Sequence, residues 1–250
     1  MKKILFMIIF LLSACRTPIV VPDNFVYHQV KTSWFDIAAY TKITDSSAPY
    51  LIYIEGDGRA FYADGRISAD PTPYGTLVRE AAFGDTHPNV IYLARPCQYI
   101  MSEKCHRQYW SNARFSPEVI EAEYEAIRQL SGDAPKILIG YSGGAQVAGL
   151  LAVTKPDLNI RKIITIAGNL DHSAWTEYHN FPPLDQSMSL SNYRERFLSF
   201  PQIHYVGGKD KIIPPQITDN FINGAAEIIK IDQAGHADGW NEAIGKIYSE

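Results

Sequence analysis

Six short apolar blocks, separated by segments with helical character, most constrain how this chain can fold. The blocks are rich in Ile, Leu, Val and Tyr, each stops at a glycine, proline or polar turn, and they occupy residues 49–58, 89–96, 135–142, 161–168, 201–208 and 226–233. Short apolar runs bounded by turn residues are typical of buried strands. Helical candidates lie between or after them, at residues 72–83, 116–130, 145–153, 214–222 and 238–248. Strands that alternate with helices predict an α/β fold with a mostly parallel central sheet and helices on both faces.

The length and charge of the chain fit one large domain. Its 250 residues are 46% hydrophobic and 20% charged, which is enough to bury a full core without a second domain. An opening hairpin is expected at residues 25–30 and 34–40. The formal net charge of -4 is mild and the basic residues are scattered, so we expect no nucleic-acid partner.

The N-terminus has the layout of a secretory signal. Two lysines precede an apolar run from Ile4 to Leu12, and small residues follow before Cys15. The run is too short to cross a hydrocarbon core of about 30 Å as a permanent helix. Residues 12–15, Leu-Ser-Ala-Cys, resemble the lipobox of bacterial lipoproteins. That resemblance implies cleavage before Cys15 and its lipidation; an uncleaved anchor and a simple secretory signal are the alternatives.

These features predict the boundaries and the location of the protein. We expect a lipoprotein signal peptide at residues 1–14, a linker at 15–24 and one domain at 25–250. Cys15 would attach the domain to a membrane of the bacterial cell envelope through its acyl chains. The residue after the cysteine is Arg16 and not aspartate, and by resemblance to sorted lipoproteins this favours the outer membrane, facing the periplasm.

Cys97 and Cys105 are the other two cysteines, and they lie close together in sequence. An oxidising periplasm would let them form a disulfide, which should stabilise the fold by roughly 2 to 3 kcal/mol in the chain-entropy model. A metal site with His106 is the alternative, but the tetrahedral preference of zinc leaves it without a fourth ligand. We therefore predict the disulfide and no metal site.

Ser142 lies between a strand block and a helical segment, within the run Gly-Tyr-Ser-Gly-Gly at residues 140–144. This run fits G-x-S-x-G, in which small flanking residues let the chain turn sharply and lift the serine hydroxyl clear of the sheet. The N–H of Gly143 and the positive end of the following helix would then face a developing oxyanion. A glycine-rich start of an ordinary helix is the competing interpretation of the run alone.

Two further residues follow strand blocks in an informative order. Asp210 comes just after the block at 201–208, and His236 just after the block at 226–233. A serine needs a base within hydrogen-bond reach, and the base needs a carboxylate that fixes its tautomer. With Ser142, these positions and their chain order resemble the α/β-hydrolase superfamily, which implies an α/β-hydrolase fold and a Ser142, His236, Asp210 triad. Asp171, after the preceding strand, is the alternative acid.

The same resemblance implies an oxyanion hole after the third expected strand, where the sequence reads Glu-Gly-Asp-Gly at residues 55–58. Aligning Gly56 with the family glycine makes the N–H of Asp57 the second donor beside Gly143, with Gly58 the choice if the turn is shifted. Glu55 replaces the histidine common in the family. Its carboxylate and that of Asp57 must point away or be paired, and nearby arginines are available for this, namely Arg59, Arg66 and Arg95. A calcium-binding loop is disfavoured because the acids lack the EF-hand spacing.

The remaining loops shape the expected specificity. Tyr109 and Trp110 either line an acyl or aromatic subsite or cover the sheet edge, and residues 171–198 form a short lid-like insertion. His172, His179 and His204 are expected to be ordinary loop or strand residues. No pattern supplies a metal or nucleotide site, so we expect no cofactor. The resemblance implies a serine hydrolase that cleaves a small-molecule ester or thioester through an acyl-enzyme. A peptidase or acyltransferase with the same triad, and a non-catalytic envelope lipoprotein that uses the fold for binding, are the alternatives.

Overall fold

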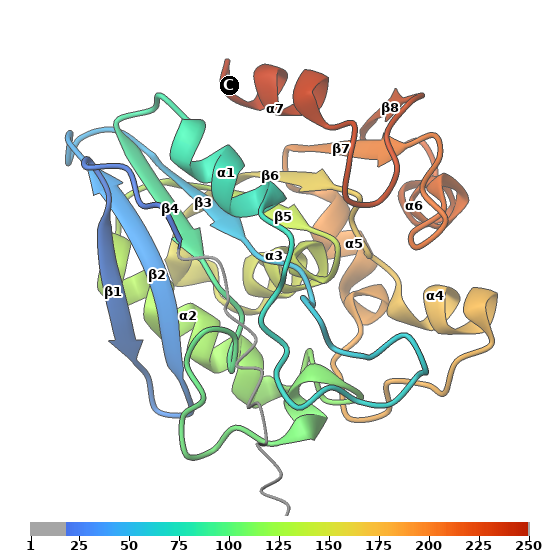
Figure 1. The fold of residues 1–250 in the computed structure, drawn as a ribbon. Helices are drawn as coiled ribbons and strands as arrows, with labels where there is room; N and C mark the ends of the chain where they lie inside the picture. Colours follow the sequence, from blue (N-terminus) through green and yellow to red (C-terminus); the bar gives the residue numbers. More distant parts are fainter. Residues whose placement is uncertain (1–18, 250) are drawn as a thin grey trace, which may run out of the picture.

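One sheet of eight strands organises the computed structural model, which describes residues 19–249 (Figure 1). The strands are β1 (Val26–Lys31), β2 (Asp36–Ile43), β3 (Tyr50–Ile54), β4 (Asn89–Leu93), β5 (Lys136–Tyr141), β6 (Ile160–Ile166), β7 (Gln202–Gly207) and β8 (Glu227–Ile231). Their order across the sheet is β1-β2-β4-β3-β5-β6-β7-β8. The β1–β2 and β2–β4 pairs are antiparallel, and every other pair is parallel. The expected hairpin is β1 with β2, and the six apolar blocks are β3 to β8.

The helices follow the expected alternation, with two additions. They are α1 (Leu77–Gly84), α2 (Pro117–Ser131), α3 (Gly143–Thr154), α4 (His172–His179), α5 (Arg194–Leu198), α6 (Pro215–Ile222) and α7 (Asn241–Ile247), with 3₁₀ turns η1 (Arg107–Trp110), η2 (Pro156–Leu158) and η3 (Leu190–Tyr193). The sequence did not predict α4 or α5, which lie in the segment expected to be a lid-like insertion. That segment mixes polar and aromatic residues, so it offers no apolar stripe at helical spacing.

The helices cover both faces of the sheet, so the domain has three layers (Figure 1). Alternate residues of β3 enter opposite layers: Leu51 and Tyr53 belong to one apolar cluster, Ile52 and Ile54 to the other. Residues of α1 and α7 complete the first cluster, and residues of α2, α3, α5 and α6 complete the second. This two-sided burial explains why the strand blocks are apolar throughout.

The carboxyl ends of β3 to β8 meet at one edge of the sheet, because these strands are mutually parallel. Glu55, Ser142, Asp210 and His236 all follow such strand ends. In open α/β sheets this is the edge at which ligands bind. Cys15 and the predicted signal peptide lie outside the described residues. Within residues 19–249, no helix combines the length and the apolarity needed to cross a bilayer.

Candidate active site

Ser142 occupies a sharp turn between β5 and α3. Its backbone has φ 51° and ψ -121°, a conformation that a non-glycine residue rarely adopts. The turn is held by close packing, since a Cβ on Gly144 would overlap the carbonyl oxygens of Ile54 and Glu55. The side of α3 can approach the end of β3 only because residue 144 is glycine. The turn predicted from the sequence is therefore present, and it is a strained strand-to-helix bend rather than an ordinary helix start.

His236 connects Ser142 with Asp210. Its Nε2 lies 3.1 Å from the Ser142 Oγ, and its Nδ1 lies 2.9 Å from the Asp210 Oδ2. The other carboxylate oxygen of Asp210 accepts the backbone N–H groups of Ile212 and Ile213, at 2.8 and 2.9 Å. The buried carboxylate is thus fixed from both sides. The imidazole tautomer that donates from Nδ1 to Asp210 leaves Nε2 able to accept the Ser142 proton.

Two aromatic residues that the sequence did not single out hold the loop of His236. The hydroxyl of Tyr141 and the indole N–H of Trp240 both donate to the carbonyl oxygen of His236, at 3.0 and 3.1 Å. The Tyr141 ring also lies 5.3 Å from the imidazole ring. Tyr141 immediately precedes Ser142, so the element that presents the serine also restrains the histidine. No local sequence signal identifies such a long-range contact.

Asp171, the alternative acid, caps a helix and does not contact His236 among the described hydrogen bonds. It precedes α4, and its Oδ1 accepts the N–H groups of Ser173 and Ala174, each at 3.0 Å. This is the hydrogen bonding of a helix N-cap. Among the described contacts, Asp210 and not Asp171 is the carboxylate hydrogen-bonded to His236.

The loop after β3 lies directly over Ser142. A Cβ on Gly56 would be 3.2 Å from the Ser142 Cβ and 3.0 Å from the Tyr141 ring, whereas a Cβ on Gly58 would meet Pro71. The neighbourhood of Gly56 therefore places Asp57 closer to the serine than Gly58. Within residues 19–249, the N–H groups of Asp57 and Gly143 have no hydrogen-bond acceptor. Both remain free to donate to a ligand.

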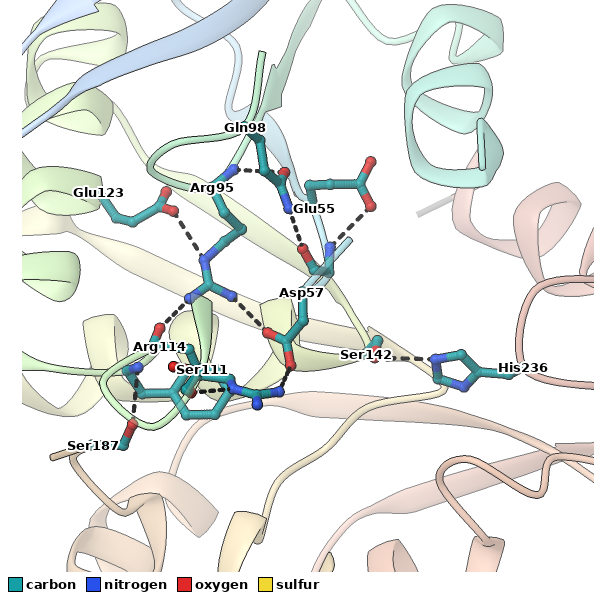
Figure 2. A network of polar contacts seen from close by, with 12 residues as sticks. Glu55, Asp57, Arg95, Gln98, Ser111, Arg114, Glu123, Ser142, Ser187 and His236 are labelled. Carbon is teal, nitrogen blue, oxygen red and sulfur yellow. Dashed lines mark hydrogen bonds and ion pairs between the residues drawn. The ribbon is translucent and has the colours of Figure 1, made fainter. Parts of the chain in front are cut away.

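The Glu55 side chain points away from Ser142 (Figure 2). Its carboxyl oxygens accept the N–H of Gly56 at 2.9 Å and the hydroxyl of Tyr92 at 2.8 Å. Burial raises the pKa of the Glu55 carboxyl, and these hydrogen bonds offset only part of that effect. The amide of Gln98 donates to the carbonyl oxygen of Gly56 at 2.9 Å. Glu55 thus holds the loop through its own hydrogen bonds, with its carboxyl group directed away from Ser142.

Asp57 is paired by two arginines. Arg114 Nη1 donates to its Oδ2 at 2.7 Å, and Arg95 Nη1 donates to its Oδ1 at 3.3 Å. Burial alone would raise the pKa of the Asp57 carboxyl, but the guanidinium groups of Arg114 and Arg95 outweigh it and hold that pKa below its usual value. Arg95 is therefore a partner of Asp57, as predicted from the sequence, whereas Arg114 was not predicted.

The other two arginines proposed as partners point elsewhere. Arg59 donates to the hydroxyl of Tyr74 and to the carbonyl oxygen of Asp70, and Arg66 pairs with Asp64 at 2.7 Å. Both lie on the loop that follows β3. Proximity in sequence therefore favoured two arginines that do not pair with Asp57, while Arg114, which does, lies in a loop more than fifty residues later.

Cys97 and Cys105 form the predicted disulfide, with a Cα–Cα distance of 5.7 Å. This pairing removes the metal-site alternative with His106. Trp110 is buried and donates its indole N–H to the carbonyl oxygen of Ser68, at 3.1 Å. Tyr109 packs edge-on against Phe35, at 4.8 Å between ring centres. These contacts pack Tyr109 and Trp110 against other parts of the protein, which favours the alternative to a substrate subsite, namely that they cover the edge of the sheet.

Among the described hydrogen bonds, the three other histidines singled out in the sequence make none with Ser142, His236 or Asp210. His204 lies in β7, bonded to Thr165, and burial lowers its pKa to about 3. His179 faces the carbonyl oxygen of Ile212, and His172 stacks on Phe115. Among residues 19–249, no cluster of three or more histidine, cysteine, aspartate or glutamate side chains is arranged to hold a metal ion.

The fold resembles those of known hydrolases despite low sequence identity. A serine hydrolase from the polyaromatic hydrocarbon-degrading bacterium Cycloclasticus zankles is 10% identical, with a TM-score of 0.63 over 90% of this chain and 95% of its own. Est1E from Butyrivibrio proteoclasticus is 12% identical, with a TM-score of 0.60 over 90% and 96%. An α/β serine hydrolase without lid from Xanthomonas campestris is 11% identical, with a TM-score of 0.54 over 93% and 94%.

Comparisons of the sequence itself identify no related family or curated protein. Identities of 10 to 12% carry no substrate information, but TM-scores of 0.54 to 0.63 over nearly the whole of each chain show a shared fold. The chain has the α/β-hydrolase fold.

Proposed function

We propose that this protein is a serine hydrolase of the bacterial cell envelope that cleaves an ester or thioester through an acyl-enzyme. The observation that carries the proposal is the pair of hydrogen bonds from Ser142 through His236 to Asp210. Structurally similar proteins described as serine hydrolases, and one described as an esterase domain, support the reaction class.

The first half of the mechanism forms the acyl-enzyme. The Ser142 Oγ attacks the carbonyl carbon while its proton passes to Nε2 of His236, and Asp210 orients and stabilises the resulting imidazolium. The N–H groups of Gly143 and Asp57 donate to the oxyanion of the tetrahedral intermediate. The bond to the leaving group then breaks, and the imidazolium returns the proton to the departing oxygen or sulfur.

The second half of the mechanism regenerates the enzyme. His236 takes a proton from water, the hydroxide attacks the acyl carbon, and the same two N–H groups hold the second oxyanion. Collapse of this intermediate breaks the bond to the Ser142 Oγ, which recovers its proton from His236. An amide substrate, with an amine as the leaving group, would give the peptidase variant of the same chemistry, and an alcohol in place of water would give the acyltransferase variant.

A fluorophosphonate probe tests the catalytic proposal. We expect covalent labelling of the wild-type protein that is lost in Ser142→Ala. Ser199→Ala provides the matched control, because Ser199 is exposed at the end of α5 and its hydroxyl bonds only a neighbouring carbonyl. Folded wild-type protein that takes no label would instead support the non-catalytic binding alternative. Turnover of p-nitrophenyl esters from acetate to long acyl chains would then define the acyl preference.

The envelope location rests on Cys15 and on the disulfide. Disulfides persist in oxidising compartments such as the periplasm, so the Cys97–Cys105 bond supports export. Lipidation of Cys15 would tether the domain, and we propose attachment to the outer membrane facing the periplasm. Labelling of cells with a fatty-acid analogue should tag the wild-type protein and not Cys15→Ser, and the variant should leave the membrane fraction. Equal labelling of both forms would contradict the anchor.

A further inference from the structure

The carboxylate of Asp57 lies against the N-terminus of α3, where the proposed oxyanion would form. A Cβ on Gly143 would overlap this carboxylate, so the carboxylate packs on the residue whose N–H is one of the two proposed donors. The Asp57 side chain is 19% exposed, whereas those of Arg95 and Arg114 are 5% exposed. An ionised carboxylate in this place would repel a developing oxyanion strongly, because the surroundings are largely shielded from water.

Besides their contacts with Asp57, both arginines contact other parts of the fold (Figure 2). Arg114 Nε donates to the carbonyl oxygen of Ser111 at 2.6 Å, and its guanidinium lies 5.5 Å from the Phe61 ring centre and 5.8 Å from that of Trp175. The aromatic rings lower the local dielectric around this ion pair.

Arg95 links the Asp57–Arg114 ion pair to other buried residues. Its Nη2 donates to the carbonyl oxygen of Arg114, and its Nε lies 3.3 Å from the Glu123 Oε1. Its backbone N–H donates to Gln98, the residue whose amide also holds the carbonyl oxygen of Gly56. Residues of three segments therefore converge at the Asp57 carboxylate: the loop after β3, the loop after β4 and the segment just before α2.

We propose that Arg114 is a positioning residue for the acyl-transfer reaction, with Arg95 as its support: it neutralises the Asp57 carboxylate beside the oxyanion and holds that carboxylate off the N–H donors. This inference rests on the proposed function of Ser142. It assigns Asp57 two separate roles, since its N–H donates to the oxyanion while its side chain must be neutralised for that donation to be useful. Arg114 itself touches neither the substrate nor the reacting atoms in this scheme.

A double-variant comparison separates neutralisation from simple support of the loop. Arg114→Gln leaves the Asp57 charge only partly compensated, so kcat for an activated ester should fall about 10²-fold while KM changes much less. Adding Asp57→Asn removes the charge and should restore kcat at least tenfold relative to Arg114→Gln alone. Arg114→Lys, which keeps the charge but loses the forked geometry, should fall between wild type and Arg114→Gln. Arg66→Gln is the matched control, because Arg66 is largely exposed on the loop after β3 and contacts Asp64 and the Tyr62 ring rather than Asp57.

The outcomes distinguish this inference from the proposed function. If wild-type protein neither hydrolyses esters nor takes the fluorophosphonate label, the proposed function fails and this inference fails with it. If wild type is active and Arg114→Gln retains its kcat, or Asp57→Asn does not improve Arg114→Gln, Arg114 only supports the loop and the inference alone is wrong. Circular dichroism checks that each variant folds. Should Arg114→Gln not fold, Arg114→Lys with and without Asp57→Asn provides the same comparison.

Discussion

Glu123 allows a quantitative test of how the polar network behind the site is ionised. It lies in α2 with no exposed surface, and among residues 19–249 its one close cationic neighbour is Arg95, whose Nε lies 3.3 Å from the Glu123 Oε1. Burial raises the pKa of the Glu123 carboxyl from 4.5 to about 8, and Arg95 offsets only part of this rise. At neutral pH the folded protein should therefore carry Glu123 mainly in its protonated form, which leaves the charge of Arg95 directed to Asp57.

The sign of the pH dependence follows from proton binding. Glu123 has the higher pKa in the folded state, so between about pH 4.5 and pH 8 the folded state binds more protons than the unfolded state. The free energy of unfolding then decreases as the pH rises through this window, and the decrease levels off above about pH 8. A shift of this size corresponds to roughly 5 kcal/mol of lost stability across the window, at 1.36 kcal/mol per pKa unit.

Glu123→Gln removes the titrating group and keeps its shape. We expect the difference in unfolding free energy between Glu123→Gln and wild type to move in favour of the variant by several kcal/mol from pH 5 to pH 9. Urea denaturation at pH 5, 7 and 9 measures it, and Glu118→Gln, on the partly exposed first turn of the same helix, controls for loss of a carboxylate from α2. A difference between Glu123→Gln and wild type that stays constant within about 1 kcal/mol would refute the reasoning.

Three further predictions concern the triad, the disulfide and the helix start. Asp210→Asn should lower kcat about 10⁴-fold in an ester assay. Asp171→Ala should cost about 1 kcal/mol of stability as a lost N-cap and leave kcat near wild type; the reverse ranking in kcat would make Asp171 the acid. Replacing Cys97 and Cys105 together by serine should lower the free energy of unfolding by roughly 2 to 3 kcal/mol in urea denaturation, and an unchanged midpoint would contradict that. Gly143→Ala should lower kcat about 10²-fold, because its methyl group overlaps the loop carboxylate that packs there; kinetics on a folded variant checks this, and full activity would show that the loop is free to move.

The order of the elements could be predicted from local patterns because it depends on local properties. A strand buried on both faces must be apolar along its whole length, so β3 to β8 are visible as blocks in the sequence. The helices α4 and α5 were not visible, because polar and aromatic residues alternate there without a helical stripe. Asp171 caps α4, and the contacts with neighbouring loops then hold a segment whose own propensity is weak.

For the site, the sequence by itself determined which chemistry could be present. A serine between glycines at a strand end, followed in order by Asp210 and His236 after later strands, is sufficient to predict their convergence, because parallel strands end at the same edge. It also restricted the partner of Cys97 to Cys105 or a metal. These inferences need only spacing, residue type and the direction of the strands.

Only the tertiary structure decided how the acidic loop over Ser142 is accommodated. Glu55 turns into the layer beneath the loop, while Asp57 stays at the site and is neutralised by Arg95 and by Arg114. Arg59 and Arg66 were equally plausible partners by distance along the chain, yet their side chains bond elsewhere. The physical reason is that an ion pair depends on distance and desolvation in space, and loops from different strands bring together residues that carry no shared signal in the sequence.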